Sequence, residues 1–159
     1  MRVRDLMSTE VHTCTSDQTL QAAARVMWEH DVGCVPVVDE QLRPVAMLTD
    51  RDICMAAYTR GERVHEIAVS SAMSAEVRTC HQDDLLVRAE RTMMDAQVRR
   101  LPVVNDEGTL VGILSLNDIV LARTDSLVGK LRQRLFGDAL RTLAAISRRR
   151  LIYTASTES

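Results

Sequence analysis

The sequence has few aromatic residues and no long apolar run. One tryptophan, two tyrosines and one phenylalanine occur among its 159 residues. A protein that binds single-stranded nucleic acid usually offers several rings on which bases stack, so that class is disfavoured. No run approaches the roughly 18 apolar residues that span a bilayer, and no apolar segment resembling a secretory signal follows the N-terminus. We therefore expect a cytoplasmic protein without a membrane span.

Cysteine is present but forms no recognisable pattern. The four cysteines are Cys14, Cys34, Cys54 and Cys80, without a CxxC pair or a dense framework. This usage is typical of thiols in a reducing compartment. His12 lies two residues before Cys14 and His81 follows Cys80, but a transition-metal site needs about four converging ligands. We predict structural cysteines and no metal site, with Cys34 and Cys54 in the core because they lie in apolar runs.

No catalytic constellation is visible. The sequence contains no Gly-x-Ser-x-Gly elbow, no P-loop and no His-Glu-x-x-His motif. The acidic pairs Asp50/Asp52 and Asp83/Asp84 have no evident partner base, and acids of this kind are common at helix N-termini. We expect no enzymatic activity.

The sequence does contain an internal repeat. Residues 3–53 align with residues 69–119 without a gap, and about 20 of the 51 aligned positions are identical. A gapless repeat indicates one supersecondary unit used twice. Two copies favour a pseudo-symmetric pair that closes on itself, because an open solenoid needs about three or more.

Each copy predicts the same order of elements, β-α-β-β-α, and hence an α+β fold. The first copy predicts a strand at 11–15, a helix from Ser16 or Asp17 to about Gly33, strands at 34–39 and 44–49, and a helix from residue 50. The second copy predicts strands at 77–80, 100–104 and 110–114, and helices at 84–96 and from 116. Gly33 is available for a positive φ, and Pro36 implies an edge strand or irregular pairing because proline cannot donate to a ladder.

The C-terminal part has a different character. Residues 126–159 carry seven basic residues against two acidic ones, a net charge of +5, whereas the whole chain carries −2. Leucines at helical spacing opposite arginines predict an amphipathic helical extension at 125–153, followed by a disordered tail at 154–159. Packing against the rest of the protein or a second subunit is favoured, although a basic helix could also meet nucleic acid or an anionic membrane.

The last strand of each copy leads into a hydroxyl and a carboxylate at a fixed spacing, Thr49-x-x-Asp52 and Ser115-x-x-Asp118. Backbone N–H groups at a helix N-terminus attract phosphate, and a carboxylate is a good acceptor for the two hydroxyls of a ribose. Arg51 could hold a phosphate in the first copy. The alternative interpretation is that both pairs only cap a helix, which is the commoner use of these residues.

Together these features resemble a tandem pair of CBS domains, the cystathionine β-synthase-type or Bateman module. The resemblance rests on motifs that occur in order and twice: Met7-Ser8 with Val11-x-Thr13, residues 32–39 and residues 45–53, then residues 98–104 and 112–119. It covers roughly residues 1–124, with one unit expected at 1–62 and the other at 63–124. The whole is similar to small stand-alone bacterial CBS-pair proteins, including the hypoxic-response type.

The resemblance implies two units packed through their sheets about a pseudo-twofold axis, with two clefts for adenosine-containing ligands such as AMP, ADP or ATP. In the family, Ser/Thr and Asp hold phosphate and ribose, while the Val-x-Thr strand and the residues before proline line the adenine pocket. Carried over, the first cleft has Thr13, Cys14, Val35, Pro36, Met47, Thr49, Arg51 and Asp52. The second cleft has Thr79, Cys80, Leu101, Pro102, Ile113, Ser115 and Asp118.

The two copies depart from the family pattern in different places. Ala46 replaces the family glycine, which the second copy keeps as Gly112, and the extra methyl could crowd a ligand. The second copy lacks an arginine equivalent to Arg51, although Arg99 and Arg100 could supply charge from another direction. We therefore expect the two clefts to bind unequally.

The resemblance implies a non-catalytic regulatory module, expected to be a homodimer, that binds an adenine nucleotide and signals to an unidentified protein in trans. No obligatory cofactor is expected, and nucleic acid is disfavoured as a partner. The alternative is a dimeric interaction scaffold with vestigial clefts that acts through the basic C-terminal helix.

Overall fold

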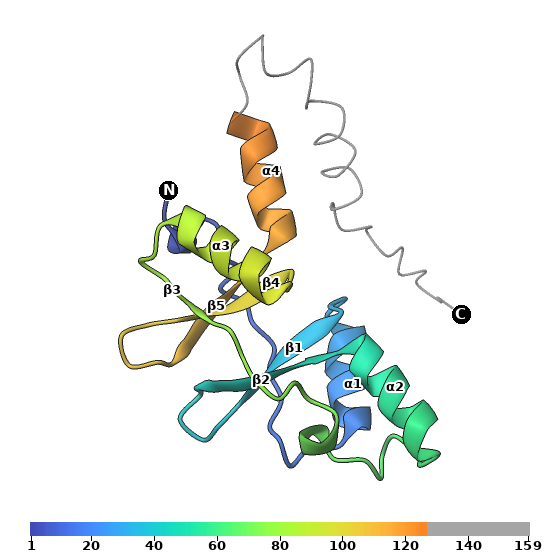
Figure 1. Cartoon of the computed structure of the whole chain (residues 1–159). Coiled ribbons are helices and arrows are strands. Elements are labelled where there is room, and N and C mark those ends of the chain that lie inside the picture. Colours follow the sequence, from blue (N-terminus) through green and yellow to red (C-terminus); the bar gives the residue numbers. More distant parts are fainter. Residues whose placement is uncertain (127–159) are drawn as a thin grey trace, which may run out of the picture. The chain divides into compact units, whose positions relative to one another are not determined.

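The computed structural model describes residues 1–126, with side chains to residue 122, so the predictions for 127–153 and for the tail at 154–159 lie outside it. Residues 1–115 form one compact unit, and residues from 116 onward belong to a second unit. The first copy contains the 3₁₀ helix η1 (Val3–Asp5), α1 (Leu20–Glu29), β1 (Cys34–Val38), β2 (Pro44–Thr49) and α2 (Asp50–Arg60) (Figure 1). The second contains η2 (Val69–Ser71), β3 (Cys80–His81), α3 (Leu86–Ala96), β4 (Arg100–Val104), β5 (Leu110–Ser115) and α4 (Leu116–Ser126). The predicted α+β class is confirmed.

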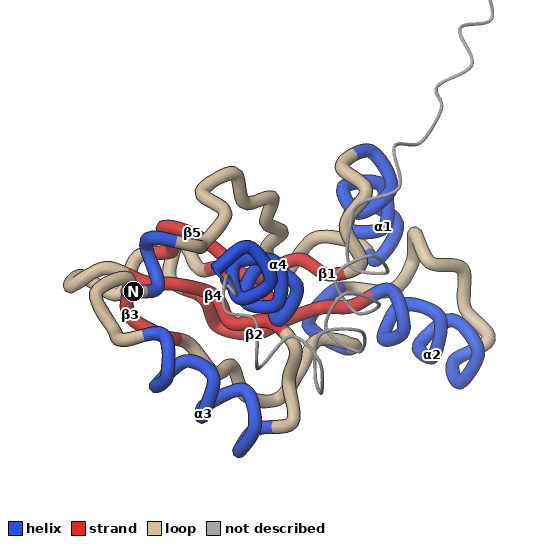
Figure 2. Tube along the Cα trace, turned by 90° about the horizontal axis from the view of Figure 1, so that it is seen from above, coloured by secondary structure: helices blue, strands red, loops and turns tan. Residues whose placement is uncertain are grey.

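Each copy builds a small sheet around a β-hairpin, and Figure 2 shows β1 beside β2 and β4 beside β5. In the first hairpin Cys34 lies opposite Thr49, and in the second Arg100 lies opposite Ser115. Both hairpins shift register at the same place, before the last residue of β1 and of β4. The duplication therefore extends to the irregularities of the backbone.

The first strand of each copy is shorter than predicted. The expected strand at 11–15 is a single parallel bridge between Cys14 and Val37, and the one at 77–80 is reduced to β3, which pairs in parallel with β4. Cys14 N donates to Pro36 O (3.1 Å), and Val38 N donates to Cys14 O (2.9 Å). The next rung toward residue 12 would need an N–H on Pro36, which proline lacks. The prediction of an edge strand or irregular pairing at Pro36 is confirmed, because β1 forms a two-stranded sheet with β2, and on its other side the ladder stops at the isolated bridge between Cys14 and Val37.

The helix ends also differ from the predictions. Thr19, rather than Ser16 or Asp17, caps α1, and its Oγ1 accepts from Ala22 N (3.2 Å). Asp31, not Gly33, has the positive φ of 51°, because Val32 N donates to Met27 O (3.0 Å) in a Schellman-type closure that places the left-handed residue just before Val32.

In the second copy the first helix ends at Ala96 as predicted, and only its start differs. Gln97, with φ of 54°, closes α3 just as Asp31 closes α1. The start of α3 moves from the expected Asp84 to Leu86, because the Asp84 carboxylate accepts from His81 N (2.9 Å) and stabilises the preceding turn.

The core of each copy is completed by the opening segment of the other copy. We call residues 1–8 the first lead-in and residues 67–74 the second lead-in. Ile67 and Val69 are buried in the core of the first copy, together with Cys14, Leu20, Val35, Val37 and Leu48. Leu20 N donates to Ile67 O (2.8 Å), and, in the reverse sense, Val3 N donates to Asp84 O (3.0 Å) in the second copy. The two copies are therefore interlocked along the chain rather than laid end to end.

Within residues 1–126, no helix has the length and apolar character needed to cross a membrane.

Candidate functional site

The β1–β2 hairpin has two different faces. Val35, Val37, Ala46 and Leu48 belong to the core cluster, whereas Met47 and Thr49 alternate with them and remain partly exposed. Of the residues predicted for the first cleft, Cys14 and Val35 thus have their side chains in the core. Pro36 lies opposite Met47, and Met47 and Thr49 share the face turned away from that core.

Thr49 and Asp52 are brought together at the start of α2, as the spacing predicts. Asp52 Oδ2 accepts from Thr49 N (2.8 Å) and from Thr49 Oγ1 (2.7 Å), and Thr49 Oγ1 accepts from Asp52 N (3.2 Å). This is a capping box, so in this structure the pair does cap a helix. Within the described residues, Asp52 Oδ1 accepts no hydrogen bond, which leaves it available to another donor.

Charged groups from both copies lie around this helix start. Arg51 is exposed and makes no ion pair within residues 1–126, while its backbone N donates to Asp50 Oδ1 (2.7 Å). Burial raises the pKa of the Cys34 thiol, and the neighbouring Arg100 guanidinium from the second copy acts in the opposite direction. Arg100, which belongs to the second copy, therefore lies close to the beginning of β1 in the first copy.

The predicted residues of the second cleft are distributed over both compact units. Cys80, Leu101 and Pro102 are buried, Thr79 and Ile113 are partly exposed, and Ser115 ends β5 in the first unit; Asp118 lies in the first turn of α4 in the second unit. Pro102 lies opposite Ile113, as Pro36 lies opposite Met47.

The cysteines are mostly structural, with one exception. Burial raises the pKa of Cys14 to about 11 and that of Cys80 to about 12, so both thiols are protonated near neutral pH. Cys54, which the sequence places in the core, is exposed on α2 because it lies outside the face that carries Ile53 and Ala56. Among residues 1–126, no three histidine, cysteine or acidic side chains gather into a group that could hold a metal ion.

Sequence reasoning missed a polar cavity along α3. It has a volume of about 500 Å³ and is lined by Thr79, Asp84, Val87, Arg88, Arg91, Thr92 and Asp95. Thr79 is its only member among the predicted site residues. The others lie at helical spacing on an exposed face, a pattern that is indistinguishable in sequence from an ordinary solvated helix.

Sequence reasoning also missed how the lead-ins reach the hairpins. Ser8 N donates to Ile113 O (3.0 Å) and Ile113 N to Ser8 O (2.9 Å), so the first lead-in extends the sheet of the second copy beyond β5. Ser74 N donates to Met47 O (2.9 Å) in the first copy. Met47 and Ile113, predicted to line the clefts, are thus the residues that hold the lead-ins.

The residue at position 46 or 112 decides how closely a lead-in can approach the hairpin. A Cβ at Gly112 would lie 2.7 Å from Met7 Sδ and 3.0 Å from Ser8 O. Ala46 is fully buried in the core of the first copy. The expectation that its methyl crowds a ligand stays a prediction, and the observed difference is that Gly112 makes room for a lead-in.

Two similar units, each built around a β-hairpin and interlocked by their lead-ins, make up a duplicated α+β module. A sequence model of the CBS domain matches residues 3–58 and 66–125, and the chain therefore belongs to the CBS domain family. CBS pairs are regulatory, ligand-binding modules and are generally not catalytic.

Two curated relatives match most of the chain. The chain is 40% identical over 119 residues to the CBS domain-containing protein YhcV of Bacillus subtilis, covering 75% of this chain and 83% of the relative. It is 36% identical over 121 residues to hypoxic response protein 1 of Mycobacterium tuberculosis, covering 73% and 80%.

Three solved structures agree with the fold. The structure of Hypoxic Response Protein I with two coordinated zinc ions matches with a TM-score of 0.69 at 32% identity, over 77% of this chain and 98% of that one. The CBS pair of protein MJ0100, solved with 5′-methylthioadenosine and S-adenosyl-L-methionine, matches with a TM-score of 0.70 at 26% identity, over 79% and 97%. CBSX2 in complex with AMP agrees in fold, with a TM-score of 0.67 at 24% identity, over 78% and 96%.

Proposed function

We propose that this protein is a non-catalytic regulatory module that binds an adenosine-containing ligand, of the AMP, ADP or ATP type, in clefts between its two CBS units. Occupancy is signalled to a separate protein in trans. The proposed sites are those carried over from the family, with Thr49 and Asp52 central to the first and Ser115 and Asp118 central to the second.

The arrangement at the start of α2 is the observation that carries the proposal. A half-buried carboxylate with one unoccupied oxygen stands beside a threonine hydroxyl at a helix N-terminus, with the unpaired cation of Arg51 adjacent. The ribose hydroxyls can donate to Asp52 Oδ1 without breaking the capping box, and the helix start and Arg51 favour a phosphate. The adenosine moiety common to the ligands of MJ0100 and CBSX2 supports the same ligand class.

Titration with AMP, ADP, ATP and S-adenosyl-L-methionine tests the proposal, with thermal unfolding and calorimetry as readouts. A ligand that binds only the folded state adds about 2.7 kcal/mol of stability at 100 times its Kd. Asp52→Ala should weaken binding at the first site, whereas Asp17→Ala, an exposed acid outside both sites, should not. If none of the four ligands raises the melting temperature of the wild-type protein, the proposal is wrong and the scaffold alternative takes its place.

We include a homodimer in the proposal. Trp28 on α1 and Tyr58 on α2 are 85% and 81% exposed, and α1 and α2 pack side by side (Figure 1). Large exposed apolar side chains mark interaction surfaces, and a twofold dimer uses the same patch on both subunits. Sedimentation of the wild type and of Trp28→Glu tests this idea, with Trp28→Phe as the matched control. A wild-type monomer at all concentrations, or a Trp28→Glu dimer as tight as the wild type, would contradict it.

A further inference from the structure

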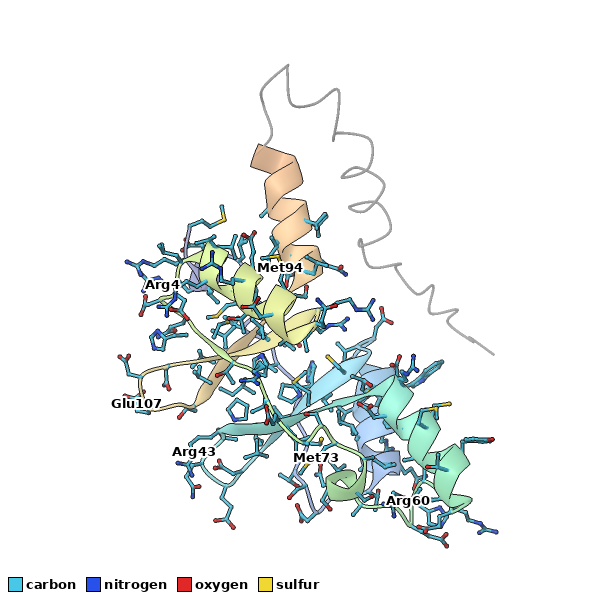
Figure 3. The ribbon with its side chains drawn as sticks, viewed as in Figure 1. Arg4, Arg43, Arg60, Met73, Met94 and Glu107 are labelled. Carbon is cyan, nitrogen blue, oxygen red and sulfur yellow. The ribbon has the colours of Figure 1, made fainter. Side chains whose placement is uncertain are left out.

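Ser74 connects the hairpin of the first copy to the segment that precedes β3. Its hydroxyl accepts from Met47 N (3.0 Å) and donates to Glu76 O (2.9 Å), while its backbone N donates to Met47 O (2.9 Å). Met47 thus has both of its backbone polar groups satisfied by one residue that lies 27 positions later in the chain. Figure 3 labels the preceding residue, Met73, which packs against the core of the first copy.

The equivalent residue in the other copy forms a different contact. Ser8 pairs with Ile113 through two backbone hydrogen bonds, and its hydroxyl makes no hydrogen bond within residues 1–126. The contacts of Ser8 and Ser74 differ because Gly112 precedes Ile113, whereas Ala46 precedes Met47. Ser8 O can approach Gly112 closely, but a Cβ there would be only 3.0 Å away, so the same approach of Ser74 O is not available beside Ala46. The hydroxyl of Ser74 takes the place of its carbonyl.

One end of this link, Met47, is a residue of the first site, and the other end, Glu76, lies close in sequence to a residue of the second site. Met47 lies two residues before Thr49, on the same face of β2. Glu76, held by the other side of the Ser74 hydroxyl, lies three residues before Thr79, which belongs to the second site. A ligand that displaced Met47 would displace the Ser74 hydroxyl and, through it, the Glu76 carbonyl, three residues before Thr79.

We propose that the Ser74 hydroxyl is a positioning group that couples the two ligand sites, so that occupancy of one changes the affinity of the other. The proposal rests on the function proposed above. Coupling of this kind is reciprocal: if a ligand at the first site favours one position of residues 74–79, a ligand at the second site that favours the same position tightens the first. The coupling depends on a side chain and can be removed without cutting the chain.

AMP is the probe for the test, with calorimetry as the readout. Asp118→Ala and Asp52→Ala give the affinities of the first and second sites alone, and the two-site titration of the full-length protein gives the coupling factor between them. We expect a factor of about five or more. Ser74→Ala should bring this factor toward one, Ser74→Thr should retain it, and Ser8→Ala, the matched control, should leave it unchanged.

A measurement without ligand keeps the inference testable if Ser74→Ala also alters affinity. Hydrogen exchange at the Met47 amide should accelerate by about three- to tenfold in Ser74→Ala, as expected for loss of one hydrogen bond, with faster exchange in residues 76–79. Ser8→Ala should change neither. An unaltered coupling factor in Ser74→Ala overturns the inference and leaves the proposed function intact. Failure of AMP to bind the wild-type protein or either single-site variant overturns the inference, whereas the proposed function fails only if ADP, ATP and S-adenosyl-L-methionine also do not bind the wild-type protein.

Discussion

Replacing Gly112 by alanine should destabilise the protein by about 1–2 kcal/mol. The added Cβ would meet Met7 Sδ at 2.7 Å and Ser8 O at 3.0 Å. Met7 can rotate away, but Ser8 is held by two backbone hydrogen bonds to Ile113 and cannot retreat without weakening them. Overpacking of this kind costs about 1–3 kcal/mol. Gly112 does not have a positive φ, so the smaller conformational entropy of alanine in the unfolded chain offsets about 0.4–1 kcal/mol.

Urea unfolding followed by circular dichroism measures this cost. The same substitution in a Met7→Ala background should cost less by about 0.5–1 kcal/mol, because neighbouring side chains in contact give coupling energies of that order. The reasoning fails if Gly112→Ala is neutral or stabilising. It also fails if the cost is the same in both backgrounds, since Met7 would then not be the neighbour that resists the methyl.

Three further predictions concern the burial of cysteine and valine side chains. Cys54 is exposed and the other cysteines are buried, so a thiol reagent at about pH 8 should modify one cysteine quickly; fast reaction of two or more contradicts this assignment. Burial raises the pKa of Cys14 from 9.0 to about 11 and that of Cys80 to about 12. The folded state therefore holds more protons than the unfolded state above pH 9, and stability should fall as pH rises from 9 toward 11; flat urea midpoints across that window would refute it. Val69→Ala should cost about 2 kcal/mol because Val69 is fully buried, whereas the exposed Val45→Ala should cost less than about 0.5 kcal/mol.

The order of elements could be predicted because periodicity and duplication are local signals. The hairpin strands, for example, were placed to within a residue by runs of Val, Leu and Met between turn residues. The first strand of each copy could not be placed as well. In the first copy its length is limited by Pro36 on a neighbouring strand more than twenty residues later, which no local pattern contains.

For the candidate site, too, the features set by local spacing could be predicted and those set by distant contacts could not. The spacing Thr49-x-x-Asp52 predicts one shared location, because three residues at a helix start bring both side chains to one side. Which side of the sheet each strand residue faces follows from alternation, yet Cys14 and Val35 were expected to line a cleft and have their side chains in the core. The Ala46 methyl is visible in the sequence, but the part played by Ser74 depends on a contact across 27 positions, which the sequence alone does not reveal.

The exchange of lead-ins gives the chain an order of assembly during synthesis. The first copy leaves the ribosome before Ile67 and Val69, which belong to its core, so it cannot close until the beginning of the second copy has been made. The second copy, in contrast, finds its own missing segment, with Val3, in a part of the chain that has already been made. Pausing of translation between residues 60 and 70 would thus hold the first copy open.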